Sequence, residues 1–230
     1  MDDAVARRLV ELNRAFYGRF ASEYSMSRRV LQPGIPRAVN ALGLFDRLLD
    51  LGCGDGRVRR ALDPSVRYLG LDLSPQLMRQ ADAGPARFQR ADLTRRGWSG
   101  GVGHIEVAVS FSVLHHLPGR ETRQGFLREM RGCLPGTGRA AVSVWQFRHR
   151  DRFARKEREW SEIGLRADDV EPGDVLMDWR RGGEGFRYVH HYSEAELLVD
   201  CVGAGFMVRE TYRSDGDTGD LGLYAILDPA

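Results

Sequence analysis

The sequence predicts an α/β fold, in which a mostly parallel sheet carries helices on both faces. Between residues 44 and 147, short apolar runs alternate with amphipathic stretches, which is the pattern of repeated strand–helix–strand units. The first apolar run ends in LLDLGCGDG (48–56), whose three glycines stand at alternate positions. A glycine loop after the first strand of such a sheet lies where ligands bind. The two observations together predict the architecture and the position of a site.

Each element follows from local patterning. Apolar residues at spacings of three and four predict a helix over 3–30, which Pro33 and Gly34 end, and a second helix over 35–42. Strands are then expected at 48–51, 67–73, 86–92, 106–112 and 138–147. Helices are expected at 57–62, 74–81 and 120–133, and Ser74 with Pro75 forms a typical helix start.

The regular pattern is interrupted between residues 148 and 187. This stretch is charged and glycine-rich, so we expect an insertion or lid there rather than sheet. Regular structure is expected to resume with a strand at 186–192, a helix at 193–204, and strands at 206–213 and 222–227.

Composition narrows the class of protein. The chain of 230 residues is 42% hydrophobic and 29% charged, which is ordinary for a soluble globular protein. It has no 18-residue apolar run and no signal-like start, so neither a membrane association nor secretion is expected. Three scattered cysteines predict no disulfide framework and no zinc or other metal site, and favour the cytoplasm. The net charge of +2 is too small to indicate a nucleic-acid partner by itself.

The spacing of acidic residues indicates the kind of ligand. Asp72 lies 20 residues after Gly52, at the end of the second expected strand, where a carboxylate can accept hydrogen bonds from both ribose hydroxyls. A dinucleotide fingerprint would need glycine at position 57, which is Arg57 here. No Gly-Lys-Ser/Thr follows the loop, so it is not a P-loop. A nucleoside other than a dinucleotide is expected.

The segments DLGCGDG, GLDLS, RADL and VSFSVLHHL together resemble class I S-adenosylmethionine-dependent methyltransferases over most of residues 45–147. The resemblance implies S-adenosylmethionine as cofactor and S-adenosylhomocysteine as product. It also implies a Rossmann-like class I methyltransferase fold, with a mostly parallel seven-stranded sheet, one antiparallel strand and an N-terminal helical cap. One structural domain would comprise an N-terminal segment covering the cofactor (1–43), the cofactor-binding core (44–147), the insertion or lid (148–187) and the C-terminal part of the sheet (188–230).

The same resemblance implies a cofactor role for particular residues. Asp50, Gly52, Gly54 and Gly56 would surround the methionine part and the ribose. Asp72 would bind the ribose hydroxyls, with Leu73 beside it. Asp92 would meet the adenine amino group, with Leu93 packing nearby, and Phe111 and Ser112 would line the methionine side. Two of these acids have a structural alternative, because Asp92 could cap a turn and Asp50 could be a satisfied buried acid. Cys53 has no base beside it in the sequence and is expected only to fit the loop.

Four further segments are similar to the tRNA methyltransferases that esterify a carboxymethyl group on wobble uridine: FYGRFASEYSMSR (16–28), SVLHHLP (112–118), EPGDVLMDW (171–179) and FRYVHHYSEAELL (186–198). That similarity implies cofactor-carboxylate contacts from Tyr17 and Arg28, a paired-histidine element at His115 and His116, and a substrate element at Arg187, Tyr188 and His190. It also implies tRNA as a partner and a small activating protein as a second one. Where that family tends to carry an Asn-Trp pair before the last strand, this chain has TGDLGLYAIL.

The chemistry of the acceptor leaves alternatives open. A carboxylate is already ionised at pH 7, so an arginine fork such as Arg187 or Arg28 in a dry pocket would suffice. A hydroxyl acceptor would need a general base, for which His115 or His116 is the candidate. Arg187 could instead lie at the surface, and the histidines could serve packing.

The substrate class is equally open at this stage. The stretch 146–160 has a net charge of +3 and could meet RNA phosphates or form a solvated helix with internal ion pairs. The alternative to a tRNA enzyme is a small-molecule O- or N-methyltransferase of specialised metabolism. An inactive cofactor-binding subunit is a third possibility.

Overall fold

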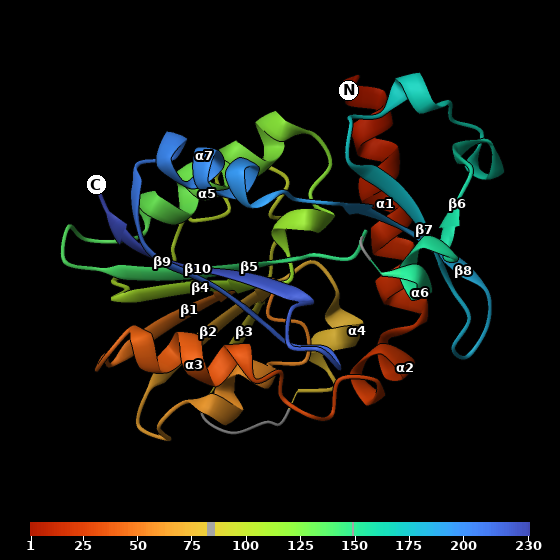
Figure 1. Ribbon diagram of the computed structural model, residues 1–230. Coiled ribbons are helices and arrows are strands. Elements are labelled where there is room, and N and C mark those ends of the chain that lie inside the picture. Colours follow the sequence, from red (N-terminus) through yellow and green to blue (C-terminus); the bar gives the residue numbers. More distant parts are fainter. Residues whose placement is uncertain (82–85, 149) are drawn as a thin grey trace.

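The computed structural model describes residues 1–81, 86–148 and 150–230, and its centre is a seven-stranded sheet (Figure 1). In sheet order the strands are β3 (Arg87–Arg90), β2 (Arg67–Asp72), β1 (Arg47–Leu51), β4 (Val107–Phe111), β5 (Arg139–Trp145), β10 (Gly222–Pro229) and β9 (Phe206–Ser214). The first five strands pair in parallel, and β10 pairs antiparallel with both β5 and β9. The expected mostly parallel sheet with one antiparallel strand is confirmed.

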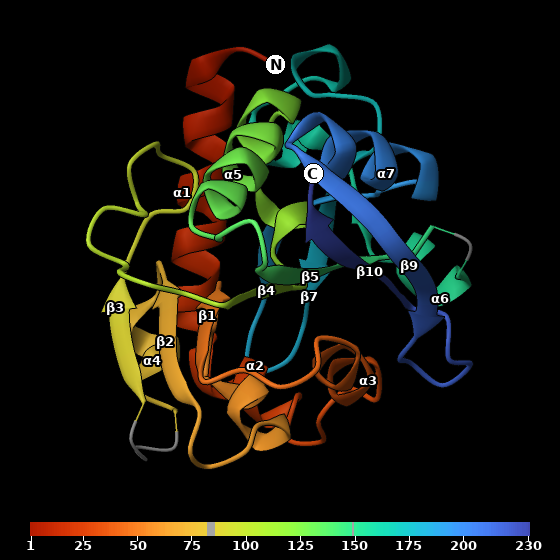
Figure 2. The ribbon, with the colours of Figure 1, turned by 90° about the vertical axis from the view of Figure 1, so that its left-hand side faces the viewer.

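Helices cover both faces of this sheet, as Figures 1 and 2 show. The helices α5 (Arg120–Gly132) and α7 (Glu194–Gly203) lie on one face; α3 (Gly34–Ala41) and the short 3-10 helix η1 (Arg57–Ala61) lie on the other. The α5 side chains Phe126, Leu127 and Met130 have the three- and four-residue spacing of a helix face and are buried in the core. Among the described residues, no helix has both the length and the apolarity that crossing a membrane would require.

The strand order reverses between β1 and β4, and this reversal places the site. The chain runs outward from β1 through β2 to β3, then returns to β4 on the other side of β1. The loops that follow β1 and β4 therefore diverge and leave a crevice at the carboxyl ends of the strands. The loops after β1, β2 and β4 all face it, as does the 3-10 helix η2 (Leu114–His116).

The expected N-terminal helix is divided into α1 (Asp3–Arg19) and α2 (Ala21–Met26). The division falls at Phe20, whose backbone leaves the helical region at φ −106° and ψ 23°. Phe20 is buried against Phe16 and Trp179, with ring centres 5.2 and 6.2 Å away. Tertiary packing of this aromatic side chain accompanies the break, and helical periodicity alone could not reveal it.

The stretch expected to lack sheet instead contains most of a second sheet. It comprises α6 (Asp151–Ala154), β6 (Glu157–Arg158), η3 (Trp160–Ile163), η4 (Ala167–Asp169) and β7 (Asp174–Trp179), and the antiparallel order is β6-β7-β8. The strand β8 (Gly185–His190) pairs with β7, not with the main sheet, which resumes only at β9. Every residue of β7 is buried, so its sequence DVLMDW lacks the alternation that reveals a half-exposed strand.

The side chain of Asn13 joins α1 to this second sheet and to η2. Its amide nitrogen donates to the carbonyl oxygens of Tyr188 (3.1 Å) and His116 (3.2 Å). Its amide oxygen accepts from the backbone nitrogen of Tyr188 at 2.8 Å. Asn13 is 7% exposed, so these backbone groups have little water to replace it.

Asn13→Ala is expected to destabilise the fold by about 2–4 kcal/mol, because the Tyr188 backbone nitrogen and the His116 carbonyl oxygen lose their hydrogen bonds to Asn13, whereas the Tyr188 carbonyl oxygen keeps its bond to His116. Urea unfolding of both proteins measures the difference. The matched control is Arg14→Ala on the next residue, whose exposed side chain forms an ion pair with Glu11. Equal stability of the two variants would contradict the bridging role of Asn13.

Candidate functional site

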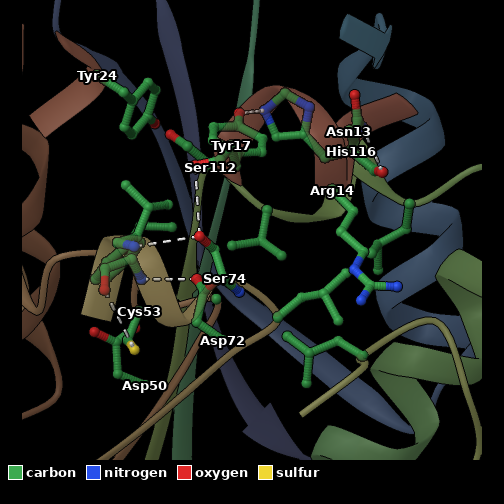
Figure 3. A pocket seen from close by; sticks show the side chains of 18 of the residues that line it. Asn13, Arg14, Tyr17, Tyr24, Asp50, Cys53, Asp72, Ser74, Ser112 and His116 are labelled. Carbon is green, nitrogen blue, oxygen red and sulfur yellow. Dashed lines mark hydrogen bonds between the residues drawn. The ribbon is translucent and has the colours of Figure 1, made fainter. Parts of the chain in front are cut away.

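A cavity of about 150 Å³ opens at the carboxyl ends of β1, β2 and β4, and α1 closes it from above. Figure 3 shows side chains from α1 and from the ends of the sheet strands pointing into the cavity, among them Tyr17, Asp72 and His116. Of the residues proposed from the sequence, eleven line the cavity: Tyr17, Asp50, Gly52, Gly54, Asp72, Leu73, Asp92, Leu93, Phe111, Ser112 and His116. Six do not line it: Arg28, Gly56, His115, Arg187, Tyr188 and His190.

The glycine loop presents backbone to the cavity. Gly52 has φ +74°, and a Cβ there would lie 2.2 Å from the side chain of Val113, so no larger residue fits. Gly54 has φ +55°, but its missing Cβ would meet nothing nearer than a Leu77 methyl at 4.0 Å. Since Gly54 lines the cavity, the space beside its backbone is open to a ligand.

Asp72 holds the loop and faces the cavity at once. Its two carboxylate oxygens accept hydrogen bonds from the backbone nitrogens of Gly54 and Ser74, each at 2.8 Å. Burial raises the pKa of Asp72, although these two bonds act in the opposite direction. Each oxygen retains acceptor capacity for a second donor, which a pair of ribose hydroxyls would supply.

Asp50 is a buried acid with one strong partner. It is 1% exposed and accepts a hydrogen bond from the hydroxyl of Tyr68 at 2.6 Å. Burial raises the pKa of Asp50 to about 7, against the lowering effect of this bond. Near neutral pH the carboxyl group therefore exists in both charge states.

The turn after β3 and the residue after β4 also line the cavity. Asp92 accepts from both the backbone nitrogen (3.1 Å) and the hydroxyl (2.5 Å) of Thr94 through the same oxygen, so it caps this turn and also lines the cavity. Both alternatives considered for Asp92 are thus compatible with its position. Ser112, after β4, has φ +61°, which is unusual for a residue with a side chain and is typical of functional sites.

Tyr17 and His116 form one wall of the cavity. The Nδ1 atom of His116 lies 3.0 Å from the carbonyl oxygen of Tyr188, which can only accept, so Nδ1 carries the proton. The Nε2 atom then accepts from the Tyr17 hydroxyl at 2.8 Å. Burial, with Arg187 nearby, lowers the pKa of His116 to about 3. Burial raises the pKa of Tyr17, so both groups are neutral at pH 7.

Two lining residues, Arg57 and Tyr24, were not anticipated as site residues. Arg57 is held by Asp55, with Nε 2.9 Å from the carboxylate, and its guanidinium lies 5.4 Å from the ring centre of Tyr24. Burial alone would raise the pKa of Tyr24, but Arg57, Arg28 and Arg187 outweigh it and lower the pKa. In the sequence, Arg57 stands out only as the residue that excludes a dinucleotide fingerprint. Its position, immediately after the glycine loop, was the available signal.

Three of the residues outside the cavity gather around Trp145, behind the Tyr17–His116 wall. The guanidinium carbons of Arg187 and Arg28 lie 4.8 and 5.4 Å from the centre of the Trp145 ring, and His115 stacks on it at 5.1 Å. Arg187 is 4% exposed and His115 is fully buried. The possibility that Arg187 is a surface residue is therefore excluded.

Tyr188 and His190 do not join this group, because residues of a strand alternate between its two faces. Arg187 points one way, whereas the Tyr188 hydroxyl and His190 Nδ1 both bond Asp174 on the other side, each at 2.7 Å. His190 Nε2 also faces Glu196 at 2.9 Å. Burial lowers the pKa of His190, but the two carboxylates outweigh it and raise the pKa. Neither side chain lines the cavity.

Comparisons with known proteins agree with this geometry. A family model described as a methyltransferase domain matches residues 49–140. A protein of Encephalitozoon cuniculi that carries the name methyltransferase is 29% identical over 93% of both chains. The tRNA (carboxymethyluridine(34)-5-O)-methyltransferase of Arabidopsis thaliana is 26% identical over 79% of this chain, which spans 44% of that protein.

Solved structures share the fold over nearly the whole chain. An S-adenosylmethionine-dependent methyltransferase from Clostridium acetobutylicum superposes with a TM-score of 0.67 at 14% identity, covering 93% of this chain and 99% of that one. The methyltransferase domain that the family model matches in residues 49–140 decides the class. The chain is an S-adenosylmethionine-dependent methyltransferase. A complex of the Haloferax volcanii Trm112 methyltransferase activator with a methyltransferase also matches the fold, with a TM-score of 0.67 at 18% identity over 94% of this chain and 96% of that one.

The residues of the methyltransferase fit its cofactor in charge and shape. Open space beside Gly54 and the two-oxygen face of Asp72 suit a ribose, and apolar Leu73 and Leu93 suit a base. Asp50 suits the cationic methionine end. The described residues contain no group of three or more His, Cys, Asp or Glu side chains that could hold a metal ion.

Asp72→Ala is expected to weaken S-adenosylhomocysteine binding by about 2–4 kcal/mol, because two hydrogen bonds to a charged group are removed. Titration calorimetry measures the affinity, and Asp72→Asn, which retains one acceptor oxygen, should be affected less. Unchanged affinity in Asp72→Ala would remove the ribose assignment. A thermal melt distinguishes weaker ribose binding from a disturbed glycine loop.

Asp50 should make the stability of the ligand-free methyltransferase fall as pH rises from about 4 to 7. Its folded pKa of about 7 exceeds the ordinary value of 3.8, so the folded state binds more protons in this window. Asp50→Asn should gain stability relative to the parent by up to about 1.4 kcal/mol per pH unit there. Urea unfolding at pH 5, 6, 7 and 8 measures this difference, and parallel profiles for the two proteins would contradict the shifted pKa.

Proposed function

We propose that this methyltransferase esterifies a carboxylate, namely the carboxymethyl group of a wobble uridine in tRNA. The observation that carries the proposal is a pair of arginine side chains, the buried Arg187 and the half-buried Arg28, that face Trp145 without a carboxylate partner in the described chain. The name of the Arabidopsis relative supports the RNA half of the proposal.

The unmet hydrogen-bonding capacity around Trp145 is specific. Nε and Nη1 of Arg187 and Nε of Arg28 are buried and have no hydrogen-bond partner within the described chain. Arg187 is enclosed by the rings of Phe16, Trp145 and Trp179, at 5.4, 4.8 and 5.5 Å from its guanidinium carbon. A buried, unpaired guanidinium is costly, and a bound carboxylate would offset that cost through a two-point fork.

The histidines also favour an acceptor that needs no base. His116 has its Nε2 occupied by the Tyr17 hydroxyl and a pKa of about 3, so it is a weak proton acceptor at neutral pH. Burial, with His116 and the Arg187 guanidinium nearby, lowers the pKa of His115 as well. A hydroxyl acceptor would require one of them to take a proton, whereas a carboxylate is ionised already.

The chain has three tasks in this reaction. Arg187 and Arg28 orient the acceptor carboxylate, the aromatic side chains exclude water, and Tyr17 and His116 line the cofactor cavity next to the Trp145 group, where the carboxylate oxygen would face the donor. When bound, S-adenosylmethionine supplies an electrophilic methyl group on a sulfonium sulfur. His115, stacked on Trp145, is a positioning residue in this proposal because it does not line the cavity.

The basic stretch after β5 supports RNA binding less than its sequence suggested. Arg150 pairs with Asp220, and Arg152 pairs with Asp217 at 2.8 Å, so the β9–β10 turn neutralises both. Arg148 and Arg155 are exposed, and His149 lies outside the described residues. The proposal includes an activating partner of the Trm112 kind, which the match to the Haloferax complex supports. It also includes location in the cytoplasm, which the free cysteines support.

Arg187→Met is expected to lower kcat/KM for tRNA bearing carboxymethyl-uridine by a factor of about 100 or more, because two charge-assisted hydrogen bonds are removed. The same change should leave S-adenosylhomocysteine affinity unchanged and should not destabilise the fold, since an unpaired buried charge is replaced by an apolar side chain. Transfer of labelled methyl groups, measured with digested RNA and with a metabolite extract, tests both halves of the proposal.

Arg180→Met is the matched control, because Arg180 is exposed and pairs with Asp178 and Glu184 near the end of β7. Full activity in Arg187→Met would refute carboxylate recognition by Arg187. Label appearing only in a free metabolite would favour the small-molecule alternative, and absence of transfer with the activator present would favour an inactive subunit.

A further inference from the structure

A second cavity, of about 500 Å³, lies on the other side of the glycine loop from the cofactor site. It is formed between α2, η1 and the residues after α4 (Pro75–Met78). Four arginines line it, Arg29, Arg57, Arg59 and Arg60, and Arg57 lines the cofactor cavity as well. Met26 contributes the one apolar side chain among its described lining residues, so the cavity is polar as well as basic.

The charge of this cavity is not balanced by the described protein. Asp55 is the one carboxylate among the described lining residues, and Arg57 occupies it at 2.9 Å. Arg29, Arg59 and Arg60 form no ion pair with any carboxylate in the described ranges 1–81, 86–148 and 150–230. Three positive charges therefore face a hollow without a counter-charge.

Two of these arginines, Arg59 and Arg60, are held in place by contacts of their side chains. Nη1 of Arg60 donates to the carbonyl oxygen of Arg29 at 2.6 Å, which ties η1 to the end of α2. The guanidinium of Arg59 lies 6.0 Å from the ring centre of Tyr68. Nη1 of Arg59 and the hydroxyl of Ser25 are buried and have no hydrogen-bond partner in the described chain. The wall of the cavity thus contains fixed donors with unused capacity.

We propose that this cavity binds a phosphate group. Phosphate presents several acceptor oxygens and a negative charge, and guanidinium forks match its geometry better than that of a single carbonyl or hydroxyl. The group can belong to a phosphodiester of an RNA strand or to a free phosphate compound. The RNA source rests on the proposed function; the phosphate chemistry does not.

The test uses the full chain, the double variant Arg59→Gln/Arg60→Gln, and the matched double variant Arg7→Gln/Arg128→Gln. The matched arginines are exposed on α1 and α5, line neither cavity, and remove the same charge. One arm measures binding of a labelled anticodon stem-loop RNA across a salt series. The other measures the thermal midpoint with millimolar pyrophosphate. Both arms omit cofactor and methyl acceptor.

If the phosphate belongs to RNA, the affinity of the cavity variant for RNA should be roughly tenfold or more below that of the matched variant. Its log–log salt slope should also fall by about 0.7 to 1 for each phosphate that the variant no longer neutralises. If the phosphate is free, the pyrophosphate-induced rise in midpoint should disappear in the cavity variant alone. Arg59→Lys/Arg60→Lys, which keeps the charge, should recover part of either effect.

Equal behaviour of the cavity and matched variants in both arms would overturn the proposal. Because no methyl transfer is measured here, that result would leave carboxylate recognition by Arg187 standing. Conversely, failure of the carboxylate proposal would leave a positive pyrophosphate result intact.

Discussion

Three hydrogen bonds from one amide, that of Asn13, connect the parts of the chain on which the site depends. They fix α1 against the backbone of Tyr188 on β8 and of His116 in η2. Tyr17 is one helical turn after Asn13, and its hydroxyl meets His116 in consequence. Because β8 is held in this position, Arg187, the residue before Tyr188, faces Trp145. The Tyr17–His116 side of the cavity and the arginine beside Trp145 are therefore positioned by one buried polar junction.

The site carries charges that its own structure leaves uncompensated. The raised pKa of Asp50 shows that an acid is buried against its preference, and Arg187 is buried without a carboxylate partner in the described chain. Both conditions cost free energy in the absence of ligand, and the large apolar core of the seven-stranded sheet offsets that cost. An acid in the cavity and arginines around Trp145 place opposite charges in the two neighbouring regions.

A feature of the structure could be predicted from the sequence when the residues that determine it are close together in the chain. The glycine loop, Asp72 and the main strands follow from contiguous patterns, and their expected positions agree with the structure to within a few residues. Asn13 acts through contacts more than 100 residues away and Trp145 through contacts about 30 or more residues away, and no local pattern marks either of them. The fully buried β7 concealed a second sheet. By contrast, strand alternation could already have separated Arg187 from its neighbours Tyr188 and His190.

In the cofactor cavity, protons and cations compete for the carboxyl group of Asp50. With a pKa of about 7, a large share of ligand-free molecules carry a proton there at neutrality. If a cationic methyl donor binds beside this carboxyl group, it displaces the proton, and by linkage its apparent affinity then falls as the medium becomes more acidic. The displaced proton passes to the buffer and adds the buffer's own ionisation heat to any calorimetric titration. Mild acidification would then weaken the binding of the methyl donor, while the same group makes the ligand-free fold more stable.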